Sequence, residues 1–507
     1  MTAVRVLAAT ARTLSLLVTS PGARFALPRP LDWSLCDDNG TLVANGTTDQ
    51  VAVFIDGLCP ATRYHMSCDL GTVSVQTLPC AGLIDAADFG VDPALADNSV
   101  ALARAIAAVP AGGTLRLAPG RYFSGPIFLK PQITLLLDAG AELAAIADRV
   151  GWPQLAAHDA TGRVMGTWEG LPEAAFAALV TAVDCTGVTI TGRGVIDGGG
   201  DRGDWWTWPK ETREGARRPR TVHLAYCDQA RLTGVTLRNS PSWTLHPYRC
   251  ADLHVSSVRI ENPPDSPNTD GLNPESCTRV TICGVDFSVG DDCIAIKACK
   301  RGTGPDTDQI AHIAPTRDVT ISHCRMMRGH GAVVLGSEMS GGIHDITISD
   351  CEFHATDRGL RLKTRRGRGG TVSGVTLTRV DMVNVPTPLA INMFYFCDHD
   401  GKSEVVQSRL PAVVDDTTPV IHDITLCDVT ARGVTLAAAA ILGLPESPVT
   451  GVQLFNVQLS YDPAAQADVP LMALGVAPVR HGGILSEFAD VAGTITEIPY
   501  QKEFVAC

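Results

Sequence analysis

Apolar and polar side chains alternate over residues 1–80 with the two-residue period of a β-strand. The apolar positions occur in short runs at Val4 and Val6, Leu14 to Val18, Trp33 and Leu35, Leu42, Val51 to Ile55, and Val73 and Val75. Asn39-Gly40 separates two of these runs and favours a hairpin, because both residues tolerate the positive φ of a type I′ turn. The pattern predicts a small β-sandwich over residues 1–80.

The pattern changes after Pro79. Apolar residues at helical spacing predict one helix over residues 98–109, with Val100, Ala103, Ile106 and Val109 on its buried face. Gly112-Gly113 ends this helix, and the chain beyond it shows strand and turn patterns without another long helix.

A longer repeat, apolar-x-apolar-x-x-apolar-x-apolar, dominates the rest of the chain. Its clear copies begin at Val280, Val319, Ile346 and Val375, and its weaker copies begin near Ala230, Leu253, Ile424 and Val452. The spacing between successive starts is too long for hairpin strands but fits the coils of a solenoid, with insertions in the two widest intervals. We therefore predict an all-β protein, with a right-handed parallel β-helix over residues 81–507 behind the N-terminal β-sandwich.

Composition excludes some partners. The formal net charge of −13 argues against nucleic acid and weakly repels any polyanion, so an anionic substrate needs a local basic patch. The longest uncharged apolar run, Val434 to Leu444, is too short to span a bilayer, and no membrane partner is expected. The 16 cysteines lack the spacing of a disulfide scaffold or zinc site, and the start of the chain lacks the apolar stretch of a signal peptide. We expect a reducing, cytoplasmic location, with the periplasm as the alternative.

The repeat also aligns charged residues. Asp291 and His330 lie at the same distance from the starts of their respective copies, which are consecutive. Lys297 and Lys363 likewise share one position, further along their copies. Parallel strands stack about 4.8 Å apart, so these side chains are expected to face one substrate. Arg361, two residues before Lys363, points to the same side of its strand.

Three carboxylates, Asp270, Asp291 and Asp292, lie close together in the sequence. Neighbouring carboxylates raise one another's pKa, and a carboxylic acid kept protonated in this way can act as a general acid. A solvated turn would explain Asp291-Asp292 alone, but it does not explain acids, a histidine and cations on one face. The set predicts hydrolysis of an anionic sugar polymer.

Four blocks, in this order, resemble glycoside hydrolase family 28, the polygalacturonases: Asn268-Thr269-Asp270, Gly290-Asp291-Asp292, Gly329-His330-Gly331 and Arg361-Leu362-Lys363. The likeness extends over residues 83–460. In front of it, the segment Gly57 to Tyr64 resembles the tyrosine corner of fibronectin type III domains, an arrangement similar to that of bacterial exo-acting members.

The resemblance implies hydrolysis of α-1,4-galacturonosidic bonds in polygalacturonate or oligogalacturonates, with inversion at the anomeric carbon. It makes Asp291 the general acid, and Asp270 and Asp292 the candidates that activate water. His330 would tune the protonation of the acid or hold a substrate hydroxyl. No cofactor or metal is expected, because hydrolysis by two carboxylates needs none.

The resemblance also implies residues that bind the substrate. Arg361 and Lys363 would bind the galacturonate carboxylate, with Lys297 and Asn268 beside them. Tyr395 lies either at the cleft or in the core. Three further arginines either widen the basic patch or form a solvated loop: Arg365, Arg366 and Arg368.

Other functions remain open at this point. A pectate or rhamnogalacturonan lyase would use calcium and a basic residue, another hydrolase would cleave rhamnogalacturonan or xylogalacturonan, and a tailspike-like β-helix would bind glycans without cleaving them. Insertions near residues 300–315 and 398–419 are expected to wall one end of the cleft, which favours exo action by resemblance. The sequence leaves the oligomeric state open.

Overall fold

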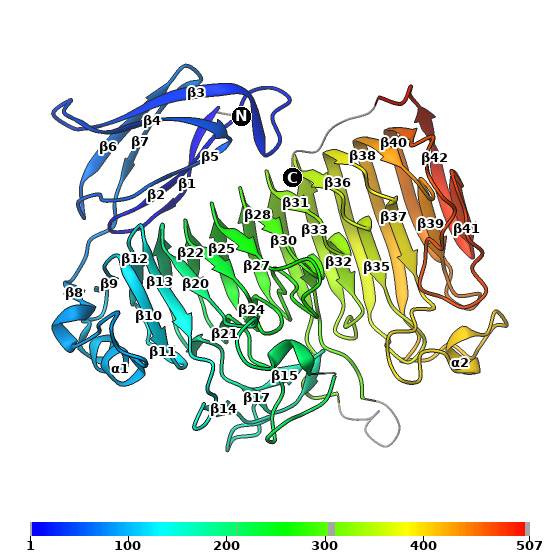
Figure 1. The fold of residues 1–507 in the computed structure, drawn as a ribbon. Helices are drawn as coiled ribbons and strands as arrows, with labels where there is room; N and C mark the ends of the chain where they lie inside the picture. The colour runs from blue at the N-terminus through cyan, green and yellow to red at the C-terminus, as the bar shows by residue number, and fades with distance from the viewer. Residues whose placement is uncertain (1–2, 209, 303–309, 502–507) are drawn as a thin grey trace.

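The computed structural model describes residues 3–208, 210–302 and 310–501, and nearly all of their regular structure is β (Figure 1). Two antiparallel sheets begin the chain and share one apolar core that includes Leu16, Leu35 and Met66. The predicted β-sandwich is therefore present. Its strands are β1 (Val4–Ala9), β2 (Leu14–Val18) and β5 (Ala52–Ile55) in one sheet, and β3 (Ala26–Asp37), β4 (Leu42–Gln50), β6 (Arg63–Cys68) and β7 (Gly71–Gln76) in the other.

Two local predictions for this sandwich have different outcomes. A hairpin does join β3 and β4, but its turn is not type I′, because Gly40 has φ +78° while Asn39 is not among the positive-φ residues. The Asp37 carboxylate accepts hydrogen bonds from the backbone N–H of Asn39 (2.9 Å) and Thr41 (2.8 Å), which fixes another turn. The second prediction is the tyrosine corner. The Tyr64 hydroxyl accepts a hydrogen bond from the Cys59 backbone N–H at 2.9 Å, the kind of contact with upstream backbone that defines this corner.

One helix, α1 (Ser99–Ala108), forms where the sequence predicts it. Its predicted buried face is wrong in part, because Val100 and Ala103 are exposed. The helix instead packs a broader stripe over the first coil of the β-helix, so adjacent positions become buried together. The buried residues of the helix are Ala101, Leu102, Ala105 and Ile106. Among the described residues, no helix is long and apolar enough to cross a membrane.

The repeat forms a parallel β-helix, and its copies stack in the predicted register. Val280 pairs with Val319, which pairs with Ile346, and the pairing continues through Val375 and Ile424. The strands that carry these copies are β27 (Thr278–Cys283), β30 (Thr316–Ser322), β33 (Ile343–Ser349), β36 (Thr371–Val383), β38 (Val420–Val434) and β40 (Val449–Tyr461). Their inward side chains form one continuous core.

The antiparallel sheets lie along one side of the β-helix, and the loops that carry β14 (Gln154–Leu155), β17 (Ala175–Phe176) and α2 (Glu404–Gln407) project from the other side in Figure 1. The Glu352 carboxylate joins the two parts by accepting the backbone N–H of Phe25 (3.1 Å) and Ala26 (2.9 Å). Fifteen cysteines are described as free thiols and nine of them are buried, as expected for small apolar core residues.

Candidate active site

A second parallel sheet of the β-helix carries the predicted site. Its strands are β29 (Asp292–Ile296), β32 (Gly331–Gly336), β35 (Arg358–Lys363), β37 (Thr387–Asn392), β39 (Ala439–Leu442) and β41 (Ile484–Glu487). Ile294 pairs with Val333 and Val333 pairs with Leu360, so the register predicted from the sequence is confirmed. Most candidate residues lie in these strands or directly next to them, whereas Asn268 and Asp270 lie in the preceding coil, in which Leu272 forms a bridge with Ile294.

Asp291 and His330 are neighbours on adjacent coils. His330 Nδ1 lies 3.1 Å from Asp291 Oδ1. Burial alone raises the pKa of Asp291, but the hydrogen bond and charge of His330 outweigh it and bring the pKa down to about 2. The same hydrogen bond raises the pKa of His330 to about 9. The pair is therefore an ion pair at neutral pH.

Asp270, and not Asp291 as expected from the sequence, is the carboxyl group with the raised pKa. Burial, followed by the charge of Asp291, raises the pKa of Asp270 to about 8. Its Oδ2 accepts a hydrogen bond from Asn273 Nδ2 at 2.8 Å. The expectation of a raised pKa at Asp291 is wrong, because His330 favours the ionised form of that carboxyl.

Asp292 pairs with the two cations that are expected to bind the substrate. Its Oδ2 lies 2.8 Å from Lys363 Nζ, and its Oδ1 lies 3.5 Å from Arg361 Nη1. Both cations lie beside the ring of Tyr395, at 5.4 Å for Lys363 and 5.8 Å for Arg361. Tyr395 is largely buried yet lines the cleft, so both readings of this residue hold in part.

Lys297 lines the same cleft but is buried and already paired. Its Nζ lies 2.6 Å from Glu338 Oε2, donates to the carbonyl oxygen of Gly336 at 3.2 Å, and lies 5.1 Å from the ring centroid of Trp243. Glu338 and Trp243 are not among the residues predicted from the sequence. A signal for Glu338 exists, because Gly336 occupies the Lys363 column of the repeat and an acid follows two residues later.

Asn268 also lines the cleft, and its side chain faces an arginine that the sequence analysis does not select. Asn268 Oδ1 accepts a hydrogen bond from Arg218 Nη2 at 2.6 Å. Arg218 is buried and also donates to the carbonyl oxygens of Pro241 and Pro267, each at 3.1 Å. The amide is therefore held in place by the protein before any ligand arrives.

Loops outside the repeat complete the cleft. They contribute Glu169, Lys210, Cys397 and Asp398, none of which the sequence pattern identifies. Glu169 lies in the short hairpin of β15 (Thr167–Trp168) and β16 (Leu171–Pro172). Its Oε1 is 2.6 Å from Lys210 Nζ.

The arginines after Lys363 form neither a substrate patch nor a solvated loop. Arg365 pairs with Asp398 at 3.2 Å and with Asp400 at 2.8 Å, and Arg368 also pairs with Asp398. Arg366 pairs with a glutamate in a later coil, at 2.5 Å. All three are buried and fasten the loop of residues 398–419 to the β-helix.

The arrangement can supply a proton, activate water and balance a negative charge within one cleft. Asp270 carries a proton near neutral pH while Asp291 is ionised, and Arg361 with Lys363 provides the positive charge. Two carboxyl groups in different protonation states are what glycosidic bond cleavage by acid and base requires. The fold and the site together define a β-helical glycoside hydrolase.

Comparison with known proteins gives the family. The model of glycosyl hydrolases family 28 matches residues 164–471, and the chain belongs to this family. The chain is 32% identical to a "Probable polygalacturonase" of Vitis vinifera over 72% of each protein. It is 28% identical to an "Endo-polygalacturonase" of Pectobacterium parmentieri, over 72% of this chain and 86% of that one.

A solved structure extends the likeness to the N-terminal sheets. The family 28 exopolygalacturonase of Yersinia enterocolitica superposes with a TM-score of 0.65, over 97% of this chain and 98% of its own, at 19% identity. At 19% identity this comparison shows a shared fold alone, and the shared fold includes the antiparallel sheets in front of the β-helix.

Proposed function

We propose that this glycoside hydrolase cleaves α-1,4-galacturonosidic bonds in polygalacturonate or oligogalacturonates. The observation that carries the proposal is the convergence of three carboxylates and Lys363 in one cleft, with Arg361 next to it at 3.5 Å from Asp292. Arginine and lysine together suit a sugar that carries a carboxylate at each residue, and the guanidinium can grip it with two hydrogen bonds. The similarity to polygalacturonases supports the same substrate class.

The mechanism follows from the proton that Asp270 and Asp291 hold between them. This proton lies on Asp270, because burial and the charge of Asp291 raise the pKa of Asp270 while His330 keeps Asp291 ionised. A substrate oxygen placed against Asp291 disfavours its negative charge, so the proton moves from Asp270 to Asp291. Asp291 then protonates the glycosidic oxygen, and the newly ionised Asp270, with Asp292, activates a water molecule on the opposite face. The product has the inverted anomeric configuration.

The charges in the cleft suggest a role for each of the remaining residues. Lys363 and Arg361 pair with Asp292, and they exchange part of this contact for the substrate carboxylate when it binds. Asp292 is then able to accept a hydrogen bond from the attacking water molecule. His330 tunes the acid through the 3.1 Å contact with Asp291.

We also propose that cleavage starts from a chain end. Both predicted insertions reach this side of the β-helix and contact each other, because Lys300 Nζ lies 3.3 Å from Asp398 Oδ1 and Arg301 lies 2.7 Å from Asp416. Asp398 lines the cleft with Glu169 and Lys210, which supports a wall at one end. The central part of the first insertion, residues 303–309, lies outside the described residues.

Product analysis tests both proposals. Polygalacturonate is incubated with the wild-type protein and with Asp291→Asn, with and without chelator, while reducing ends, ultraviolet absorbance and product lengths are followed together. We expect short products from the first time point, no new absorbance, no effect of chelator and turnover by the variant that is lower by about 100-fold or more. Mid-sized oligomers at early times would contradict exo action, and absorbing products or loss of activity with chelator would indicate a lyase. Activity on branched pectins alone would move the substrate to rhamnogalacturonan or xylogalacturonan.

A further inference from the structure

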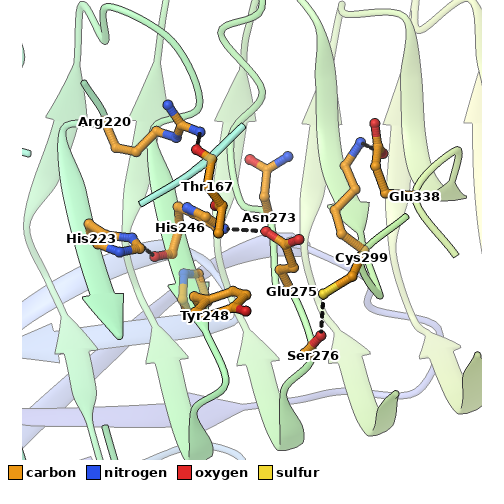
Figure 2. A network of polar contacts seen from close by, with 12 residues as sticks. Thr167, Arg220, His223, His246, Tyr248, Asn273, Glu275, Ser276, Cys299 and Glu338 are labelled. Carbon is orange, nitrogen blue, oxygen red and sulfur yellow. Dashed lines mark hydrogen bonds and ion pairs between the residues drawn. The ribbon is translucent and has the colours of Figure 1, made fainter. Parts of the chain in front are cut away.

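Glu338 is a buried carboxylate that touches the catalytic cleft without belonging to the acid cluster. Its Oε2 lies 2.6 Å from Lys297 Nζ, and both side chains are almost fully buried. Among the described residues, it is the carboxylate with which Lys297 forms an ion pair. Figure 2 shows Glu338 beside the polar network of the sheet.

The surroundings fix the charge of this pair. Burial alone raises the pKa of Glu338, but the charges of Lys297 and Lys300 outweigh it and hold the pKa well below its ordinary value. On the other side of Lys297, the preceding coil places Glu275 at the same position of the repeat. Its Oε2 lies 2.9 Å from His246 Nε2 (Figure 2), so this carboxylate is already engaged.

Lys297 also faces the catalytic acids. Its ammonium charge acts on Asp270, Asp291 and Asp292, and all four residues line one cleft. A lysine released from Glu338 would therefore find carboxylates of the reaction within its reach. An ammonium ion paired with a carboxylate favours the ionised form of that group.

We propose that Glu338 is a positioning residue that holds Lys297 beside Trp243 and leaves the catalytic carboxylates without a competing ion-pair partner. The inference rests on the proposed function and adds to it a group that acts on the acids through Lys297. Lys297 is expected from the sequence to bind substrate, but in this proposal it acts on the protonation of the catalytic carboxylates.

The sign of the effect follows from the charges. Replacing Glu338 by Gln leaves Lys297 positive and unpaired, so the proton shared by Asp270 and Asp291 is lost at a lower pH. Replacing Lys297 by Met removes a charge that opposes this proton, so the proton is retained to a higher pH. Within the described part of the chain, the other charged or titratable groups around this cluster are Asp292, His330, Arg361, Lys363, Glu275, His246, Arg220, Lys300, Lys210, Glu169 and Asp398.

The experiment compares the pH profile of kcat/KM on oligogalacturonate for the wild-type protein, Glu338→Gln, Lys297→Met and the double variant. We expect the basic limb to move to lower pH by about one unit in Glu338→Gln and to higher pH in Lys297→Met. The double variant should return close to the wild-type limb. Glu338→Asp, which keeps the charge, should stay near the wild type. Circular dichroism of each variant checks the fold.

Single variants that shift the limb in the same direction, or only lower its height, would overturn the inference and leave Glu338 a structural residue. Infrared titration of Asp270, whose protonated band is identified as the one lost in Asp270→Asn and thereby separated from that of Glu275, provides a readout that needs no turnover. Its protonated band should disappear at lower pH in Glu338→Gln than in the wild-type protein, and an unchanged midpoint would also refute the inference. If the wild-type protein fails to cleave galacturonan, the proposed function fails, while the infrared result still decides the role of Glu338.

Discussion

The proton on Asp270 makes the stability of the fold depend on pH, and Asp270→Asn should remove that dependence. The pKa of this carboxyl is raised from 3.8 to about 8 by burial and by the charge of Asp291. The folded protein therefore binds more protons at Asp270 than the unfolded chain does between these two values. In this window the stability contributed by the group falls as pH rises, by about 1.4 kcal/mol for each pH unit.

The size of the effect follows directly. Between pH 5 and pH 7 the wild-type protein should lose roughly 3 kcal/mol relative to Asp270→Asn, and the difference should stop growing above about pH 8. The amide has the shape of the neutral acid, and its oxygen can still accept the hydrogen bond from Asn273. The variant should thus be the more stable protein at neutral pH although its catalysis is impaired.

Urea denaturation at pH 5, 6, 7 and 8 measures this difference. Asp318→Asn, at an exposed position of β30 in the same β-helix, serves as the matched control and should differ from the wild type by the same amount at every pH. A difference between Asp270→Asn and the wild type that stays constant or shrinks with rising pH would refute the assignment of the proton to Asp270.

Three further predictions concern the acid, the cations and the N-terminal sheets. Asp291→Asn should fold and bind oligogalacturonate in a calorimeter, but its turnover should fall by about 10²–10⁴-fold or more, since general acid catalysis is lost; retained turnover would exclude Asp291 as the acid. Arg361→Gln should raise KM for oligogalacturonate by roughly 10-fold or more, because a charge-assisted hydrogen bond worth about 1.5–3 kcal/mol is removed; an unchanged KM in steady-state assays would place the substrate carboxylate elsewhere. Gly284→Ala should destabilise the packing of the sandwich on the β-helix by about 1–3 kcal/mol, because its Cβ would lie 2.4 Å from the Cβ of Ala52. Limited proteolysis should cut this variant faster than Gly22→Ala, which shares a positive φ but meets nothing within 4 Å, and equal rates would contradict the close packing.

The sequence predicts the β-helix and its register well because each coil repeats a local pattern. Ile294, Val333 and Leu360 align in the structure as their spacing indicates, and this alignment brings Asp291 next to His330. A repeat therefore turns distances along the chain into contacts between coils.

The remaining features depend on contacts that no local pattern records. Lys210 and Glu169 meet at 2.6 Å from separate loops, and the repeat places Glu338 near the site but does not show its ion pair with Lys297. Burial of Asp270 raises its pKa and the position of His330 keeps Asp291 ionised, and both depend on how the coils stack rather than on a local sequence pattern.

The stereochemistry of the first product tests the central claim most directly. Proton NMR can follow the anomeric signals while the wild-type protein digests oligogalacturonate, before mutarotation mixes the anomers. We expect the β-anomer to appear first from the α-linked substrate, because two carboxylates act on opposite faces of the sugar. First appearance of the α-anomer, or of an unsaturated product, would contradict the mechanism.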